Sequence, residues 1–149
     1  MAHMQRSVLL GEYDFTLDAK NRVAVPARLR PAFAEGAFIT RGFENCIAVY
    51  PPEEWDRFVA ARTGDLPEMS EEGRKMRRYI FGAAVSDQLD GQGRIKVPAY
   101  LLQFSGVTRD VTIIGVQDHI ELWDRAAWAR YRKQMEEGAD AAANQLAVQ

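Results

Sequence analysis

The sequence of 149 residues is long enough for one ordinary domain or for two small repeats that share a core. Hydrophobic residues make up 47% and charged residues 27%, which is the balance of a globular protein. No apolar run approaches the roughly 18 residues that a membrane-spanning helix needs. The formal net charge of −2 excludes a protein that coats nucleic acid through overall positive charge, but it leaves room for local basic patches.

Cysteine and histidine are too few for several kinds of site. Cys46 has no partner for an internal disulfide, and His3 and His119 do not complete the ligand set of a Cys/His zinc site. The start of the chain does not resemble a signal peptide, so we expect a cytoplasmic protein. We also expect it to bind no metal and no cofactor. Residues 1–7 look like an extension or a cloning remnant outside the fold.

An internal repeat is centred on a five-residue motif. Asp18-Ala19-Lys20-Asn21-Arg22 returns as Asp90-Gly91-Gln92-Gly93-Arg94, so the two aspartates are 72 positions apart. Later matches are 73 positions apart, which indicates one inserted residue in the second copy; they pair Gly42, Ile47, Tyr50, Trp55 and Phe58 with Gly115, Ile120, Trp123, Trp128 and Tyr131. The repeat covers most of the chain and predicts two copies of one structural unit.

Each copy predicts the same order of elements: strand, tight turn, short strand, short helix, two strands and a second helix. The expected elements of the first copy are strand 9–17, turn 18–22, strand 23–25, helix 26–34, strands 37–40 and 47–50, and a helix from 51. Those of the second copy are strand 83–89, turn 90–94, strand 95–97, a helix from 98 to Gly106, strands 111–115 and 120–123, and a helix with Asp124 as its N-cap.

Two further segments are expected outside these units. Residues 66–81 have apolar residues at helical spacing, acids first and bases last, and predict a helix that Gly82 ends. The basic run from Arg74 to Arg78 suits the negative end of this helix dipole better than a binding site. The alanine-rich residues 138–149 show no pattern, and we expect them to form a disordered tail.

The repeated motif has the composition of a three-residue hairpin turn. Asp18 and Asp90 occupy the position at which a carboxylate accepts backbone N–H groups, and Asn21 and Gly93 fall at the left-handed position. In such a turn the two flanking residues face each other, which brings each aspartate to the arginine four positions later.

Two interpretations of these Asp–Arg pairs are open. As a simple clamp, an exposed ion pair contributes about 0.2–1 kcal/mol and has no further role. As a binding site, the aspartate orients the guanidinium so that its other donors point outward to a phosphate or to the edge of a guanine. Lys20 at the tip of the first turn, followed by Arg28 and Arg30, makes a local positive patch that favours a site.

The remaining patterns favour structural roles. The aromatic positions that repeat in register are expected in the core: Tyr50 with Trp123, Trp55 with Trp128, and Phe58 with Tyr131. Phosphate-binding loops and nucleophile motifs are absent from the sequence. A catalytic pair of Asp18 and Asp90 would require one carboxyl with a raised pKa, whereas an adjacent arginine lowers it. We therefore expect no catalytic residues.

Several segments together are specific for one family. They are Gly11-Glu12-Tyr13, Leu17-Asp18-x-Lys20-x-Arg22, Val25-Pro26-Ala27-Arg28, Tyr50-Pro51 with Trp55, Gly82, Leu89-Asp90-x-x-Gly93-Arg94, Val97-Pro98, Gly115 and Glu121-Leu122-Trp123-Asp124. Over about residues 8–135 the chain resembles the MraZ family of bacterial transcriptional regulators.

This resemblance implies a mixed β/α, mainly β fold. Two tandem swapped-hairpin repeats of the SpoVT-AbrB type would pack as a pseudo-dimeric β-barrel with short flanking helices. The implied units are repeat 1 at 11–53, a helical connection at 54–81, repeat 2 at 82–126 and a continuation of the last helix at 127–137.

The resemblance also implies a sequence-specific regulator, usually a repressor, of the division and cell-wall gene cluster that includes its own gene. Family members bind G-rich direct repeats in double-stranded promoter DNA, assemble into ring-shaped homo-oligomers and associate with the nucleoid rather than a membrane. Carried over to this sequence, the DNA-binding residues are Asp18, Lys20, Arg22, Asp90 and Arg94.

The motifs depart from the family pattern at two positions. Asn21 replaces the more usual glycine of the first motif, and Gln92 stands where the first copy has Lys20. We therefore expect the second turn to contact DNA more weakly. The alternative function is that of an oligomeric interaction or assembly protein without specific DNA binding.

Overall fold

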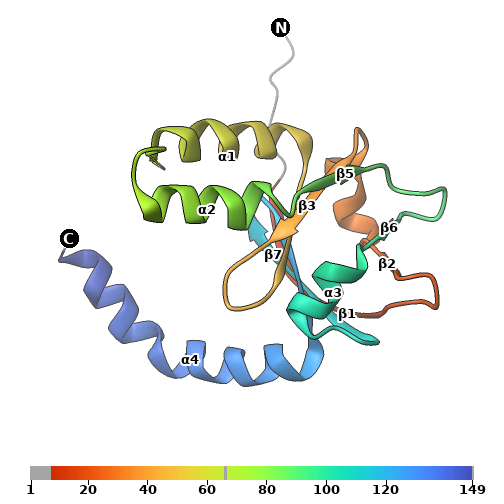
Figure 1. Cartoon of the computed structure of the whole chain (residues 1–149). Helices are drawn as coiled ribbons and strands as arrows, with labels where there is room; N and C mark the ends of the chain where they lie inside the picture. The colour runs from red at the N-terminus through yellow and green to blue at the C-terminus, as the bar shows by residue number, and fades with distance from the viewer. Residues whose placement is uncertain (1–7, 66, 149) are drawn as a thin grey trace, which may run out of the picture.

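The computed structural model describes residues 8–65 and 67–148 (Figure 1), so the expected extension at residues 1–7 lies outside the described part. The elements in chain order are β1 (Leu9–Thr16), β2 (Arg22–Ala24), the 3-10 helix η1 (Ala27–Phe33), β3 (Ala37–Arg41), β4 (Ile47–Tyr50), α1 (Pro52–Asp65), α2 (Glu71–Phe81), β5 (Val85–Asp87), β6 (Arg94–Lys96), α3 (Ala99–Ser105), β7 (Asp110–Gln117), β8 (Ile120–Asp124) and α4 (Arg125–Ala147). Both copies of the sequence repeat thus contain the expected order of strands and helices.

Six strands form one antiparallel sheet in the order β1-β7-β8-β4-β3-β5, and β2 and β6 form a separate two-stranded ribbon. The sheet interleaves the two halves of the chain, because β1 pairs with β7, β5 pairs with β3 and β4 pairs with β8. A closed barrel, which the sequence resemblance implied, is not present in the described residues. The short strands β2 and β6 pair only with each other, so they do not join the sheet edges β1 and β5.

The strand register relates the two halves by an approximate twofold axis. Val23 pairs with Ile95 in the ribbon, and Ala48 pairs with Glu121 at the β4–β8 contact. In each pair the two residues occupy equivalent positions of the sequence repeat. The duplication is therefore visible in the strand pairing as well as in the sequence.

Both halves contribute to one main core, which includes Phe33, Ile39, Ile95 and Ile113. The repeated aromatic residues form two smaller clusters on the other face of the sheet. Tyr50 and Trp55 lie in the first cluster, and Trp123 and Trp128 lie in the second. The expectation of burial is confirmed for these four residues, whereas Phe58 and Tyr131, which were expected in the core with them, are only half-buried.

Local signals explain where most helices begin and end. Ser70 caps α2 by accepting the N–H of Gly73, and Asp124 caps α4 by accepting the N–H of Ala127. Gly106 ends α3 in the left-handed conformation, with φ of 75°. The helix expected from residue 66 begins later, at Glu71, and residue 66 itself lies outside the described residues.

The expectation of a disordered tail is wrong for residues 138–147, while residue 149 lies outside the described part of the chain. Helix α4 continues to Ala147, although nearly all of its second half is exposed. Alanine has the highest intrinsic helix propensity, and no proline interrupts the segment, so a helix forms there without an apolar–polar pattern of large residues.

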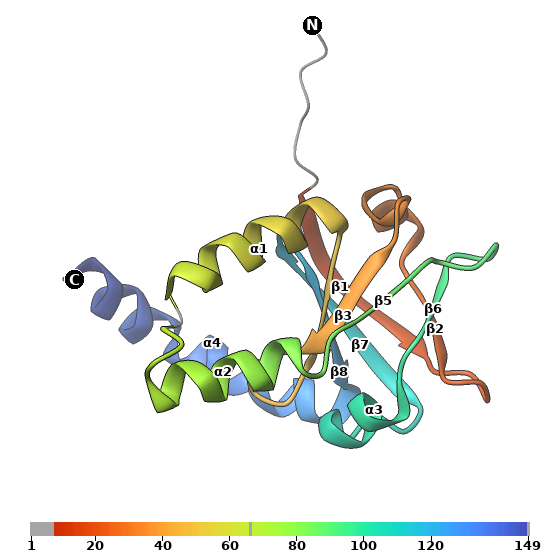
Figure 2. The same ribbon diagram turned by 45° about the horizontal axis from the view of Figure 1, so that its top comes forward.

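The ribbon and the long helices lie at opposite ends of the molecule. In Figure 2 the turns that precede β2 and β6 project on one side, whereas α1, α2 and the end of α4 extend on the other. A ligand bound at the ribbon therefore leaves these helices free for other contacts.

Replacing Ile95 by alanine should lower the free energy of unfolding by about 2–5 kcal/mol, because the side chain is fully buried where the halves meet. Replacing its exposed neighbour Lys96 by alanine should change it by less than about 0.5 kcal/mol. Chemical denaturation measures both; equal effects would contradict the burial of the ribbon's inner face.

Candidate nucleic-acid interface

The two motif turns have the same hydrogen bonds. The Asp18 carboxylate accepts the backbone N–H of Lys20 at 2.8 Å and of Arg22 at 2.9 Å, and it accepts the Arg22 Nε–H at 2.8 Å. The equivalent bonds of Asp90, from Gln92 and Arg94, are 2.9, 3.0 and 2.8 Å long. The expected facing of aspartate and arginine is therefore confirmed in both copies.

The left-handed positions also fall where the sequence predicted them. Asn21 has φ of 61° and Gly93 has φ of 75°. Their N–H groups close the turns by donating to the carbonyls of Asp18 and Asp90, at 3.0 and 2.9 Å. Asparagine and glycine are the residues that adopt this conformation most readily, so the two copies reach one geometry with different side chains.

Pairing of β2 with β6 brings the turns together. Val25 donates its N–H to the carbonyl of Gly93 at 2.9 Å, and Val97 donates to Asn21 at 2.8 Å, so each strand is bonded to the turn of the other half. Before the turns, β1 pairs with β7 and β5 pairs with β3, so neither strand pairs with the strand that follows its own turn. Both motifs consequently lie on a single ribbon.

A contact between the motifs could not be foreseen from either one alone. Arg94 Nη1 lies 3.5 Å from Asp18 Oδ2, while Arg94 Nε remains bonded to Asp90. Arg94 therefore lies between the two carboxylates and links the turns electrostatically. Its side chain is 27% exposed and that of Arg22 is 29% exposed, so both guanidinium groups reach the surface while their orientation is restricted.

Lys96 is a candidate site residue that the sequence interpretation missed. Strand alternation puts Val23 and Ile95 inward, and the residues on either side of them outward. Lys96 is therefore exposed directly opposite Arg22 on the neighbouring strand. The alternation of Arg94, Ile95 and Lys96 in the sequence contained this signal. The second half thus contributes an exposed lysine beside the turn of the first half, whose tip carries Lys20.

Arg30 supports the ribbon from below. Its Nε–H donates to the carbonyl of Val25 at 2.8 Å, and its guanidinium lies against Gly93. A Cβ atom at Gly93 would meet Arg30 Nε at 2.3 Å. The backbone conformation therefore favours glycine at this position, and a side chain here would displace the end of Arg30.

Both aspartates are held in the ionised form. The hydrogen bond from the backbone N–H of Arg22 keeps the pKa of Asp18 below its usual value, and the guanidinium of Arg22 acts in the same direction. The backbone N–H of Arg94 lowers the pKa of Asp90 in the same way. A catalytic dyad requires one raised carboxyl pKa, so this geometry argues against proton-sharing chemistry between the two.

Comparison with known proteins identifies the family. The family model described as "MraZ protein, putative antitoxin-like" matches residues 8–77 and again residues 80–148. The chain belongs to the MraZ family. Both matches contain one Asp–Arg turn, so the family repeat coincides with the repeat seen in the strand pairing.

Individual MraZ relatives cover nearly the whole chain. A protein of Desulfitobacterium hafniense is 37% identical over 93% of this chain and 96% of its own length. A Limosilactobacillus fermentum protein is 40% identical over 84% and 87%, and a Roseiflexus castenholzii protein is 39% identical over 94% and 97%. All three are named transcriptional regulator MraZ, and none of these names denotes an enzyme.

The part of this MraZ chain that the structure describes contains neither a candidate metal site nor a candidate membrane-spanning helix. There, no group of three or more histidine, cysteine, aspartate or glutamate residues is arranged to hold a metal ion. Among the same residues no helix is long and apolar enough to cross a membrane.

The lowered carboxyl pKa values can be measured in this MraZ chain. Because ionised Asp18 and Asp90 are stabilised, the turns should keep their full stability above pH 3.8 and lose it as the pH falls through the lower, folded values. A carbon-detected NMR titration should show both carboxyl groups titrating below 3.8. A midpoint at or above 3.8 for either group would contradict the described turn.

Substitution of Gly93 tests the left-handed backbone conformation of the second turn. Gly93→Ala should destabilise the protein by about 1–3 kcal/mol, because alanine is strained at positive φ and displaces Arg30. Gly91→Ala in the same turn is the matched control, since its Cβ meets no atom within 4 Å. Thermal or chemical denaturation compares the two, and equal stability of both variants would refute the left-handed conformation of Gly93.

Proposed function

We propose that this protein is a sequence-specific, DNA-binding transcriptional regulator that reads double-stranded DNA with its paired Asp–Arg turns. The observation that carries the proposal is the meeting of both turns on one ribbon, with Arg94 between the two carboxylates. Four cationic side chains lie on or beside the outer face of this ribbon, and the two carboxylates orient the arginines among them: Lys20, Arg22, Arg94 and Lys96. The printed names of the relatives support the same function.

A two-stranded ribbon has the right dimensions to enter the major groove of B-DNA. There, terminal nitrogens of Arg22 and the Nη2 of Arg94 can reach the acceptors O6 and N7 of guanine, because the bond to the aspartate of the same turn uses Nε and the contact of Arg94 with Asp18 uses Nη1. Lys20 and Lys96 are flexible cations suited to phosphate contacts that set the position of the ribbon. This division of roles gives guanine-rich sites the advantage.

The finer features of the function come from the family resemblance. We propose that the sites are G-rich direct repeats upstream of the division and cell-wall gene cluster, that binding represses this cluster and the protein's own gene, and that the protein lies in the cytoplasm at the nucleoid. We also propose that each half is a swapped-hairpin repeat, which the pairing of β1 with β7 and of β5 with β3 supports.

Self-association would explain how an acidic chain binds DNA firmly. One ribbon makes few contacts, whereas a ring-shaped homo-oligomer presents several ribbons at fixed spacing. Once one ribbon is bound, the others act at a high effective concentration on the neighbouring repeats. The net charge of −2 meanwhile limits binding to unrelated DNA.

Arg22→Ala should abolish preference for the selected DNA site and leave the fold intact, since each lost guanine contact costs about 1–3 kcal/mol of discrimination. The matched control is Arg74→Ala, an exposed arginine on α2 at the other end of the molecule. A binding selection with the purified protein supplies the site, and gel shifts at several salt concentrations compare the variants. Undiminished specific binding by Arg22→Ala would overturn the site. If the wild type retains no DNA, the alternative function would be favoured, namely an oligomeric interaction or assembly protein without specific DNA binding.

A further inference from the structure

Equivalent helices of the two halves have different surroundings. In the first half, Trp55 and Phe58 of α1 share a cluster with Met76 and Ile80 of α2, so α2 covers α1 and the adjoining sheet. In the second half, the equivalent positions on α4 are Trp128 and Tyr131. No second helix covers them among the described residues, although the sheet beneath is built in the same way.

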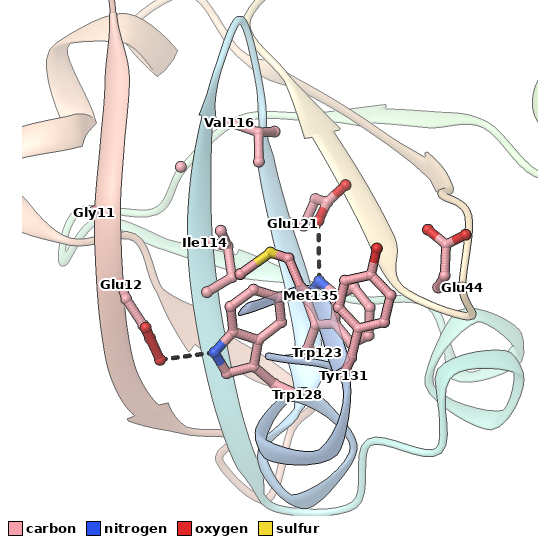
Figure 3. Close-up of a pocket in the computed structure, with 11 residues that line it drawn as sticks. Gly11, Glu12, Glu44, Ile114, Val116, Glu121, Trp123, Trp128, Tyr131 and Met135 are labelled. Carbon is pink, nitrogen blue, oxygen red and sulfur yellow. Dashed lines mark hydrogen bonds between the residues drawn. The ribbon is translucent and has the colours of Figure 1, made fainter. Parts of the chain in front are cut away.

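The uncovered position is a groove of about 510 Å³ between α4 and strands β1, β7 and β8 (Figure 3). Its wall is mainly apolar and is formed by Ile114, Val116, Trp123, Trp128, Tyr131 and Met135, and the carboxylates of Glu12, Glu44 and Glu121 also line it. The indole N–H groups are bonded to carboxylates, that of Trp128 to Glu12 at 2.7 Å and that of Trp123 to Glu121 at 3.0 Å. These bonds fix the rings so that apolar surface lines the groove.

The second half of α4 has an apolar face that stays exposed to solvent, because no other part of the described chain packs over it. This face is a shallow, open apolar surface formed by α4 alone, and it shares Tyr131 and Met135 with the groove. The face continues at helical spacing through Gly138, Ala139, Ala142, Ala143 and Leu146. Met135 is 43% and Leu146 71% exposed, and a helix without packing partners is marginal in water. The segment therefore has the properties of a helix that packs against another surface.

We propose that residues 134–147 of α4 from one copy of the chain lie in the groove of a second copy, where they take the place that α2 occupies in the first half. This inference deepens the self-association in the proposed function and depends on it. Its mode is that of an amphipathic helix in an apolar groove. Apart from Tyr131 and Met135, which border both, the groove and the inserted segment are formed by different residues, so the contact can pass from copy to copy until a ring closes.

Charge favours this occupant. The inserted segment carries acidic residues outside its apolar face, namely Glu136, Glu137 and Asp140. The part of α4 beside the groove carries the exposed bases Arg130 and Lys133, and Arg132 of the same part is paired with Glu12 of the groove wall at 3.0 Å. When the second half of one α4 lies along the first half of another, Arg130 and Lys133 face these acids beside a mainly apolar contact. The first half of one α4 and the second half of another can therefore lie side by side without like charges facing each other along the whole contact.

Two alanine variants test the inserted face. Ala142→Glu places a charge on it, whereas Ala141→Glu makes the same change at the preceding residue, about 100° around the helix and outside this face. Sedimentation of the full chain should show at least a twofold lower particle mass for Ala142→Glu and an unchanged mass for Ala141→Glu. Circular dichroism checks that both keep α4. An assembled wild type whose mass neither variant changes would overturn this contact alone; a wild type monomeric at all concentrations would overturn self-association as well.

A mixing experiment tests the groove. Val116→Arg places a charge in its wall at a residue that is already 36% exposed. Neither Val116→Arg nor Ala142→Glu should assemble alone, but an equimolar mixture should form a complex of both, because each variant retains the surface that the other has lost. Failure of the mixture to associate, while the wild type assembles, would overturn the pairing of groove and segment.

Discussion

The surface formed by the β2–β6 ribbon and its two turns depends on the hydrogen bonds that the carboxylates of Asp18 and Asp90 accept within their own turns. Asp18 and Asp90 each bind two backbone N–H groups and one guanidinium, so a single side chain both closes the turn and orients the arginine that follows. Removing the carboxylate would leave the backbone donors without partners and the guanidinium with more rotational freedom. Charged acceptors make stronger hydrogen bonds than neutral ones, which suits a turn that must stay rigid at the surface. The ribbon then combines two such turns into one surface.

Local chemistry made the turns predictable. The roles of Asp18, Asn21 and Gly93 follow from short-range rules about carboxylates and left-handed residues, and the structure confirms them. Lys96 and the link between Arg94 and Asp18 were missed because they depend on which strands pair. A sequence repeat shows that two units are alike, but it does not show that their second strands meet at a twofold axis.

Larger-scale features followed less directly from the sequence. The pairing order of the sheet depends on contacts between distant segments, and it leaves β1 and β5 as edges where the resemblance implied closure. Helix α4 extends beyond its pattern of large apolar residues because alanine favours the helical conformation, which a search for large residues at amphipathic spacing overlooks. The boundary of α2 shifted to Glu71 for a local reason, since Ser70 is the residue able to cap it.

The interleaved sheet has a consequence for the folding unit. Because β1 depends on β7 and β5 on β3, neither half of the chain contains the partners of its own first strand. An isolated half would expose open edges on strands that are internal in the whole sheet, and such edges tend to pair with other chains. The duplicated sequence therefore encodes one cooperative unit rather than two autonomous ones. Its two Asp–Arg turns are gained or lost together when the chain folds.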